Sequence, residues 1–120
     1  MSEQHEPFSA EQRPLYEVKS NLFKGLAHPV RVRVLEVLTA HDEVPVTALL
    51  EDTGLEASHL SQHLAVLRSH NLVTAERRGS QVFYRLAYPQ VAELLRVARG
   101  LLVDILETTS RRLAEAATRA

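Results

Sequence analysis

The chain has 120 residues, 45% hydrophobic and 24% charged, with a formal net charge of −1. About one domain fits this length, which excludes two-domain dinucleotide-binding enzymes and large barrels. Cysteine is absent, so disulfides, thiolate nucleophiles and cysteine-based metal sites are excluded.

The N-terminal segment is polar and acidic, unlike a signal peptide, and we find no apolar stretch long enough to cross a membrane. We therefore expect a cytoplasmic protein without membrane contact. Residues 1–13 lack a periodic apolar pattern and are expected to form a flexible arm before one domain over 14–120. A first helix is predicted over 14–27, where apolar residues recur with a helical period. His28 then follows as the expected N-cap of the next helix, with Pro29 at its first position.

Three shorter helices are predicted over 29–41, 46–51 and 56–70. A tight turn at Thr53-Gly54-Leu55 joins the last two, which makes them a helix-turn-helix pair. The second helix of the pair carries one apolar stripe, expected to be buried, made of Leu60, Leu64 and Leu67.

Beyond the pair, the pattern changes from a helical period to alternation. Two strands over 73–78 and 81–86 flank Gly79-Ser80, which predicts a β-hairpin with a two-residue turn. A last helix over 89–117 has a wide apolar face and a length of about 45 Å, more than a small domain covers. We expect this helix and the first one to pack against a second copy of the chain.

The element order predicts a mainly α fold with a small β-hairpin, a winged helix-turn-helix (α-α-α-α-β-β-α). Residues 68–85 hold four arginines and one glutamate, whereas residues 1–17 hold four glutamates and one arginine. The near-neutral net charge of the whole chain therefore includes a basic zone, residues 68–85, that can bind phosphate. The predicted DNA-contacting residues are Ser58, His59, Ser61, Gln62, His63, Arg68, Arg77, Arg78 and Ser80.

Three segments carry a family resemblance. Residues 26–35 (LAHPVRVRVL), 58–67 (SHLSQHLAVL) and 77–86 (RRGSQVFYRL) stand in order and at the right spacing. They resemble the opening motif, recognition helix and wing of the ArsR-type (arsenic-repressor-like) bacterial transcription regulators. Ala57 and Ala65 replace polar or basic residues common in that family, so the operator sequence is not predicted.

The resemblance implies a homodimer joined through its first and last helices, which binds a palindromic double-stranded DNA operator and mostly represses. An inducer would release the DNA. Many relatives sense metals through Cys-x-Cys on the third helix, where this chain has only apolar residues and Thr47. Others use ligands on the last helix, where this chain has Tyr88, Gln90 and Leu101. We therefore expect no metal and no cofactor, and a non-thiol effector such as a small molecule.

The sequence leaves two alternatives to a DNA-binding repressor. A winged-helix module that holds a protein partner would have the same fold, but exposed aromatics would then be more typical than arginines. A metal-responsive repressor with a non-standard His and carboxylate site is a second alternative, with His59 and His63 at a metal-ligand spacing. No catalytic residue is predicted and the chain is not expected to be an enzyme, because helix geometry points Ser61 away from His63.

Overall fold

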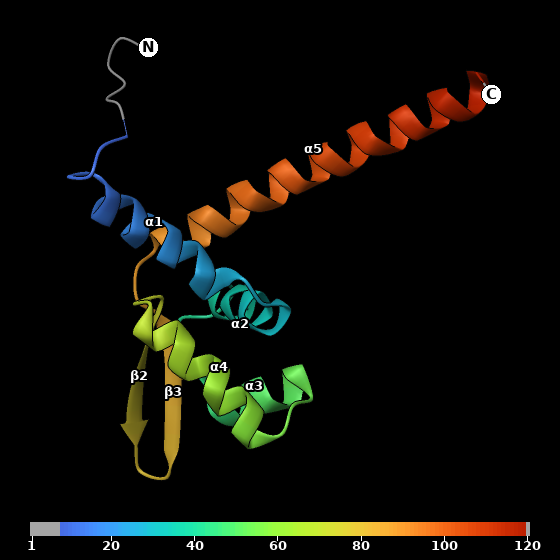
Figure 1. The fold of residues 1–120 in the computed structure, drawn as a ribbon. Helices are drawn as coiled ribbons and strands as arrows, with labels where there is room; N and C mark the ends of the chain where they lie inside the picture. The colour runs from blue at the N-terminus through green and yellow to red at the C-terminus, as the bar shows by residue number, and fades with distance from the viewer. Residues whose placement is uncertain (1–7, 120) are drawn as a thin grey trace.

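The computed structural model describes residues 8–119, over which helices pack with a small three-stranded antiparallel sheet (Figure 1). The elements in chain order are α1 (Arg13–Leu26), α2 (Pro29–Thr39), β1 (Val44–Pro45), α3 (Val46–Thr53), α4 (Ala57–Ser69), β2 (Val73–Arg78), β3 (Gln81–Leu86) and α5 (Gln90–Arg119). The predicted winged helix-turn-helix order is confirmed, with β1 as an addition. Residues 1–7 of the predicted arm lie outside the described residues.

Local capping sets several of the helix boundaries. His28 has an extended backbone, and its Nδ1 accepts a hydrogen bond from the Val30 amide at 3.1 Å, so the predicted N-cap of α2 is confirmed. Gly54 ends α3 with a φ of 70°, a left-handed conformation that glycine adopts without strain. Asn71 follows α4 with a φ of 61°, which an asparagine tolerates better than most residues.

The core forms around α2, which packs against α1, α3, α4, α5 and β3. The stripe predicted on α4 is buried, and it fixes the rotation of that helix about its axis. Burying a leucine side chain is worth about 1.5–3 kcal/mol, so this stripe holds α4 firmly in place. The buried core consists of Val34, Leu35, Leu38, Val44, Leu49, Leu60, Leu64, Leu67, Leu72, Val73, Tyr84 and Val91.

The sheet has the strand order β1-β3-β2. The predicted hairpin is confirmed, since Arg78 pairs with Gln81 across a turn in which Gly79 has a φ of 64°. The sequence does not predict β1, because two residues are too few to show alternation. Pro45 has no amide hydrogen, which suits its place in an edge strand.

Two helices expose large apolar side chains. Figure 1 shows α5 extending away from the rest of the molecule, with Val91 near its start as the buried residue. Its 30 residues do not form a stretch apolar enough to span a membrane, and no other described helix does. The exposed apolar residues of α1 and α5 are Leu15, Tyr16, Val18, Leu22, Phe23, Val97, Leu101, Leu102, Val103, Ile105, Leu106 and Leu113.

Candidate nucleic-acid interface

The polar face of α4 is opposite its buried leucines. Ser58, His59, Ser61 and Gln62 are all exposed there, as predicted. Their hydroxyl, imidazole and amide groups supply both donors and acceptors, which is what contact with base edges and phosphates requires. The helix that carries this face packs against β2, so α4 lies beside the hairpin (Figure 1).

His63 is different from its neighbours on α4. It is half-buried, its ring centroid lies 4.1 Å from that of His28, and its Nδ1 lies 3.2 Å from Nη1 of Arg31. A guanidinium only donates hydrogen bonds, so Nδ1 of His63 is the acceptor. His63 is a predicted DNA-contacting residue, yet it is less exposed than the other polar residues of α4. The position faces the start of α2 rather than open solvent.

Arg31 connects three helices through one side chain. Besides its bond to His63, it donates from Nε to the Gly25 carbonyl at 2.9 Å and from Nη2 to the Lys24 carbonyl at 3.1 Å. These carbonyls are in the last turn of α1, which lacks the usual helical partners, and the Lys24 carbonyl also accepts a hydrogen bond from the Ala27 amide. Arg31 thus couples the position of α4 to the end of α1. The sequence does not predict this role, because the partners lie up to 32 residues away.

The surroundings of His63 disfavour its protonated form. Burial lowers the pKa of this imidazole, and the neighbouring His28, Arg31 and His59 lower it further. The neutral ring is therefore preferred in the folded protein, in agreement with its acceptor role toward Arg31.

We expect acidification to destabilise the protein through His63. Because its pKa is lower when folded than when unfolded, its contribution is complete above the unfolded pKa, near 6.5, and is lost as the pH falls through the folded value. Urea unfolding at pH 7 and pH 5 should show a smaller loss of stability in His63→Gln than in the wild type, since Gln accepts a hydrogen bond without titrating. Equal losses in both proteins would contradict the assignment.

Two of the predicted phosphate-contacting arginines have intramolecular partners. Arg68 donates a hydrogen bond to the hydroxyl of the buried Tyr84. Arg78 forms an ion pair with Glu43, and its guanidinium lies 3.9 Å from the ring centroid of Phe83. The hydrogen bond to Glu43 holds the pKa of Arg78 above its usual range, so it stays positively charged.

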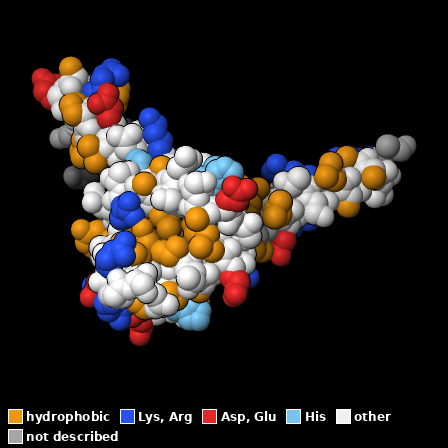
Figure 2. Space-filling model, turned by 90° about the horizontal axis from the view of Figure 1, so that it is seen from below, with side chains coloured by type: hydrophobic (Ala, Val, Ile, Leu, Met, Phe, Trp, Pro, Cys, Tyr) orange, Lys and Arg blue, Asp and Glu red, His pale blue; other side chains and the backbone are white. Residues whose placement is uncertain are grey.

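Arg77 and Ser80 are the freer groups of the hairpin. Both are exposed, and the Arg77 side chain has no ion pair or hydrogen bond within residues 8–119. Figure 2, viewed from the hairpin end of Figure 1, shows Lys and Arg side chains beside an apolar central area. The hairpin and the neighbouring α4 therefore both carry exposed hydrogen-bond donors, and the hairpin adds exposed positive charge.

Metal-ligating groups do not gather in the described part of the chain. Nowhere in residues 8–119 do three or more His, Asp or Glu side chains come together to hold a metal ion. His59 is exposed, while His63 is committed to Arg31 and His28.

Comparison with known proteins gives a consistent set of similarities. A helix-turn-helix domain family matches residues 26–76, which include α2, α3 and α4. The chain is 48% identical over 96 residues to Rv0081, an HTH-type transcriptional regulator of Mycobacterium tuberculosis; the match covers 80% of this chain and 84% of that protein.

Solved structures agree with these matches. The crystal structure of Rv0081 has a TM-score of 0.77 and 46% identity, covering 82% of this chain and 98% of the other. The solution structure of Mb0332 from Mycobacterium bovis has a TM-score of 0.74 and 30% identity, covering 84% of this chain and 93% of the other. Mb0332 is described as a homodimeric winged helix-turn-helix DNA-binding domain and a possible ArsR-family regulator. The crystal structure of the transcriptional repressor BigR from Xylella fastidiosa has a TM-score of 0.66 and 32% identity, covering 78% of this chain and 96% of the other.

Proposed function

Because the chain belongs to the ArsR-type family of winged helix-turn-helix transcriptional regulators, we propose that it acts as a homodimeric repressor of a palindromic DNA operator. Its class as a DNA-binding regulator follows from the family. A repressor role is supported by the similarity to BigR, whose name describes it as a transcriptional repressor. A regulator of this kind acts on chromosomal DNA, so we propose that it works in the cytoplasm and without catalysis.

The proposed DNA contacts rest on one observation, the exposed polar face of α4 beside the arginines of the hairpin. In this proposal α4 enters the major groove, where Ser61 and Gln62 contact base edges. Ser58 and His59 lie at the start of the same face. Arg77 binds the phosphate backbone from the hairpin, with Ser80 at its turn.

Three predicted contacts need more than an exposed side chain. Arg78 and Arg68 reach phosphate only if DNA competes with Glu43 and with the Tyr84 hydroxyl. Exposed ion pairs are worth little, so a phosphate can displace Glu43 from Arg78. His63 contributes by orienting α4 through Arg31 rather than by reaching a base.

Dimerisation is proposed through α1 and α5, within a domain that spans residues 14–120. Both helices carry apolar side chains that are exposed in the single chain. Figure 2 shows apolar side chains along the two projections of the molecule. A monomer rarely exposes so extended an apolar surface, whereas a dimer interface buries one. The homodimeric description of Mb0332 supports the same arrangement.

The experiment is operator binding, measured by fluorescence anisotropy on DNA from upstream of the chain's own gene. Affinity should fall roughly a thousandfold between about 50 and 200 mM salt if about six phosphates are contacted. Ser61→Ala and Gln62→Ala should each cost about 1–3 kcal/mol on the operator and little on scrambled DNA. Arg77→Ala should weaken both DNAs equally and reduce the salt slope by about one.

Gln90→Ala, an exposed glutamine at the start of α5, is the matched control and should bind DNA normally. The proposal would be contradicted if the affinity for DNA did not change with salt concentration, or if it were equal for operator and scrambled DNA. In that case a winged-helix module for a protein partner becomes the better reading. Stoichiometric zinc, nickel or cobalt binding in equilibrium dialysis would instead favour a metal-responsive repressor.

A further inference from the structure

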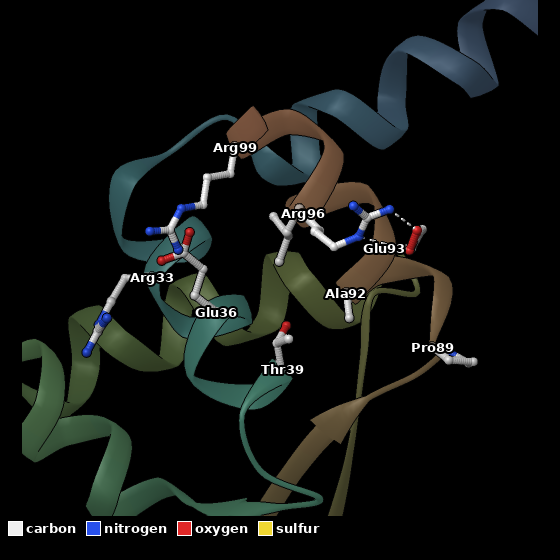
Figure 3. Close-up of a pocket in the computed structure, with 9 residues that line it drawn as sticks. Arg33, Glu36, Thr39, Pro89, Ala92, Glu93, Arg96 and Arg99 are labelled. Atoms are coloured by element: carbon white, nitrogen blue, oxygen red, sulfur yellow. Dashed lines mark hydrogen bonds and ion pairs between the residues drawn. The ribbon is translucent and has the colours of Figure 1, made fainter. Parts of the chain in front are cut away.

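A cavity of about 590 Å³ lies between α2 and the first turns of α5, on residues that the proposed DNA contacts do not include (Figure 3). Its volume is within the range of roughly 300–1,000 Å³ that is usual for small-molecule sites. Pro89, Ala92 and Leu95 supply apolar surface, and Leu95 packs against the core. An apolar part of a ligand would therefore pack against a surface that the core holds in place.

Three arginines line the same cavity, but two of them are already paired. Arg33 donates hydrogen bonds to both carboxylate oxygens of Asp52, at 2.8 and 2.7 Å. Arg96 pairs with Glu93 one turn earlier on α5, as the dashed lines in Figure 3 mark. Both arginines are charged and have their donors largely occupied.

Arg99 is the third arginine, and its side chain has no ion pair or hydrogen bond within residues 8–119. In Figure 3 its side chain extends across the cavity toward Glu36 of α2. The planar guanidinium offers a fork of donors that matches a carboxylate in two parallel hydrogen bonds. Arg96 lines the same cavity, and it can also bind a carboxylate because its exposed ion pair with Glu93 is weak.

The carboxylates of the lining limit the charge that a ligand can bring. Glu36 and Glu93 border the cavity together with the arginines. A second negative charge on the ligand would approach these groups and be repelled. The lining thus fits a molecule with one negative charge and an apolar body better than a dianion or a neutral molecule.

We propose that this cavity binds a small organic monocarboxylate, held by Arg99 and seated on Pro89, Ala92 and Leu95. The inference rests on the proposed function, since it assigns the effector site of the repressor. On one side of the cavity, α2 packs against α4, which carries the DNA-contacting face. On the other side, α5 carries the apolar face proposed for the dimer. A monocarboxylate touching both helices fixes the angle between them and so changes the separation of the two α4 helices.

The test is an amide NMR titration of the full chain with benzoate, phenylacetate and hexanoate. Each acid is paired with its neutral primary amide. The acids should shift the amide signals of residues 33–39 and 92–99, and the neutral amides should not. Arg99→Gln should weaken binding of the acids roughly tenfold, as loss of a charge-assisted hydrogen bond predicts. Arg111→Gln, on the same helix but outside the cavity lining, is the control and should bind like the wild type.

The proposal is overturned if none of the three acids shifts those signals, if the neutral amides bind as well as the acids, or if the dianion phthalate binds more tightly than benzoate. An acid that binds without changing operator affinity would overturn the effector role. Operator binding is measured on the same preparation without any acid, so failure of the DNA-binding proposal is seen separately. Arg99→Gln should keep normal operator affinity while losing its response to the acids.

Discussion

Replacing Leu101 and Ile105 by glutamate should convert the proposed dimer into a monomer and lower operator affinity by about a hundredfold or more. Both side chains are exposed, at 60% and 49%, and lie one turn apart on the same face of α5. In the proposed dimer they are buried against the partner, where an unpaired carboxylate is strongly disfavoured. A lone subunit would then contact one half-site only.

This prediction is measured by sedimentation equilibrium together with operator binding. The fold should persist, because both positions lie far along α5 from its buried residue, Val91. Ala114→Glu with Thr118→Glu adds the same charge on the face of α5 that carries Glu107 and Arg111, and is the matched control. If the control dissociates as readily as the Leu101 and Ile105 variant, the dimer face is assigned wrongly. A dimeric Leu101 and Ile105 variant would reject α5 as the interface.

Replacing Arg31 by methionine should lower the free energy of unfolding by about 2–3 kcal/mol, because its three bonds come from a charged donor and two of them are part-buried. The substitution removes the bonds to the carbonyls of Lys24 and Gly25 and to the Nδ1 of His63. Methionine keeps most of the side-chain volume, so the loss reports mainly the hydrogen bonds. Operator affinity should also fall, since α4 is no longer tied to the end of α1.

Urea denaturation measures the effect, and Arg33→Met is the matched control. Arg33 lies two residues further along α2, and its partner Asp52 is also exposed to solvent. An exposed ion pair contributes little to stability, so the control should change the midpoint much less. Comparable losses in the two variants would show that Arg31 does not act as a link between helices.

Features controlled by neighbours along the chain are predictable here from the sequence. The His28 cap depends on Val30, two residues away, and the hairpin turn depends on Gly79. The leucine stripe of α4 is visible because its period is helical. In each case one local rule decides the conformation, and the structure confirms it.

Features that join distant segments are not predictable in the same way. Glu43 pairs with Arg78 over 35 residues, and Arg31 meets His63 over 32. No local pattern distinguishes these charged and polar residues from their solvated neighbours. The partial burial of His63 is not predictable for this reason, because helical period places it one turn after the exposed His59 but says nothing of what the adjoining helix brings to it.

The sheet ends on each side in a strand that resists pairing with another molecule. On one edge, β1 is two residues long and contains Pro45, which cannot donate a ladder hydrogen bond. On the other, β2 carries Glu76, Arg77 and Arg78, and charged side chains discourage edge-to-edge association. The arginines of the hairpin therefore protect the protein against aggregation through its sheet, whether or not DNA is bound.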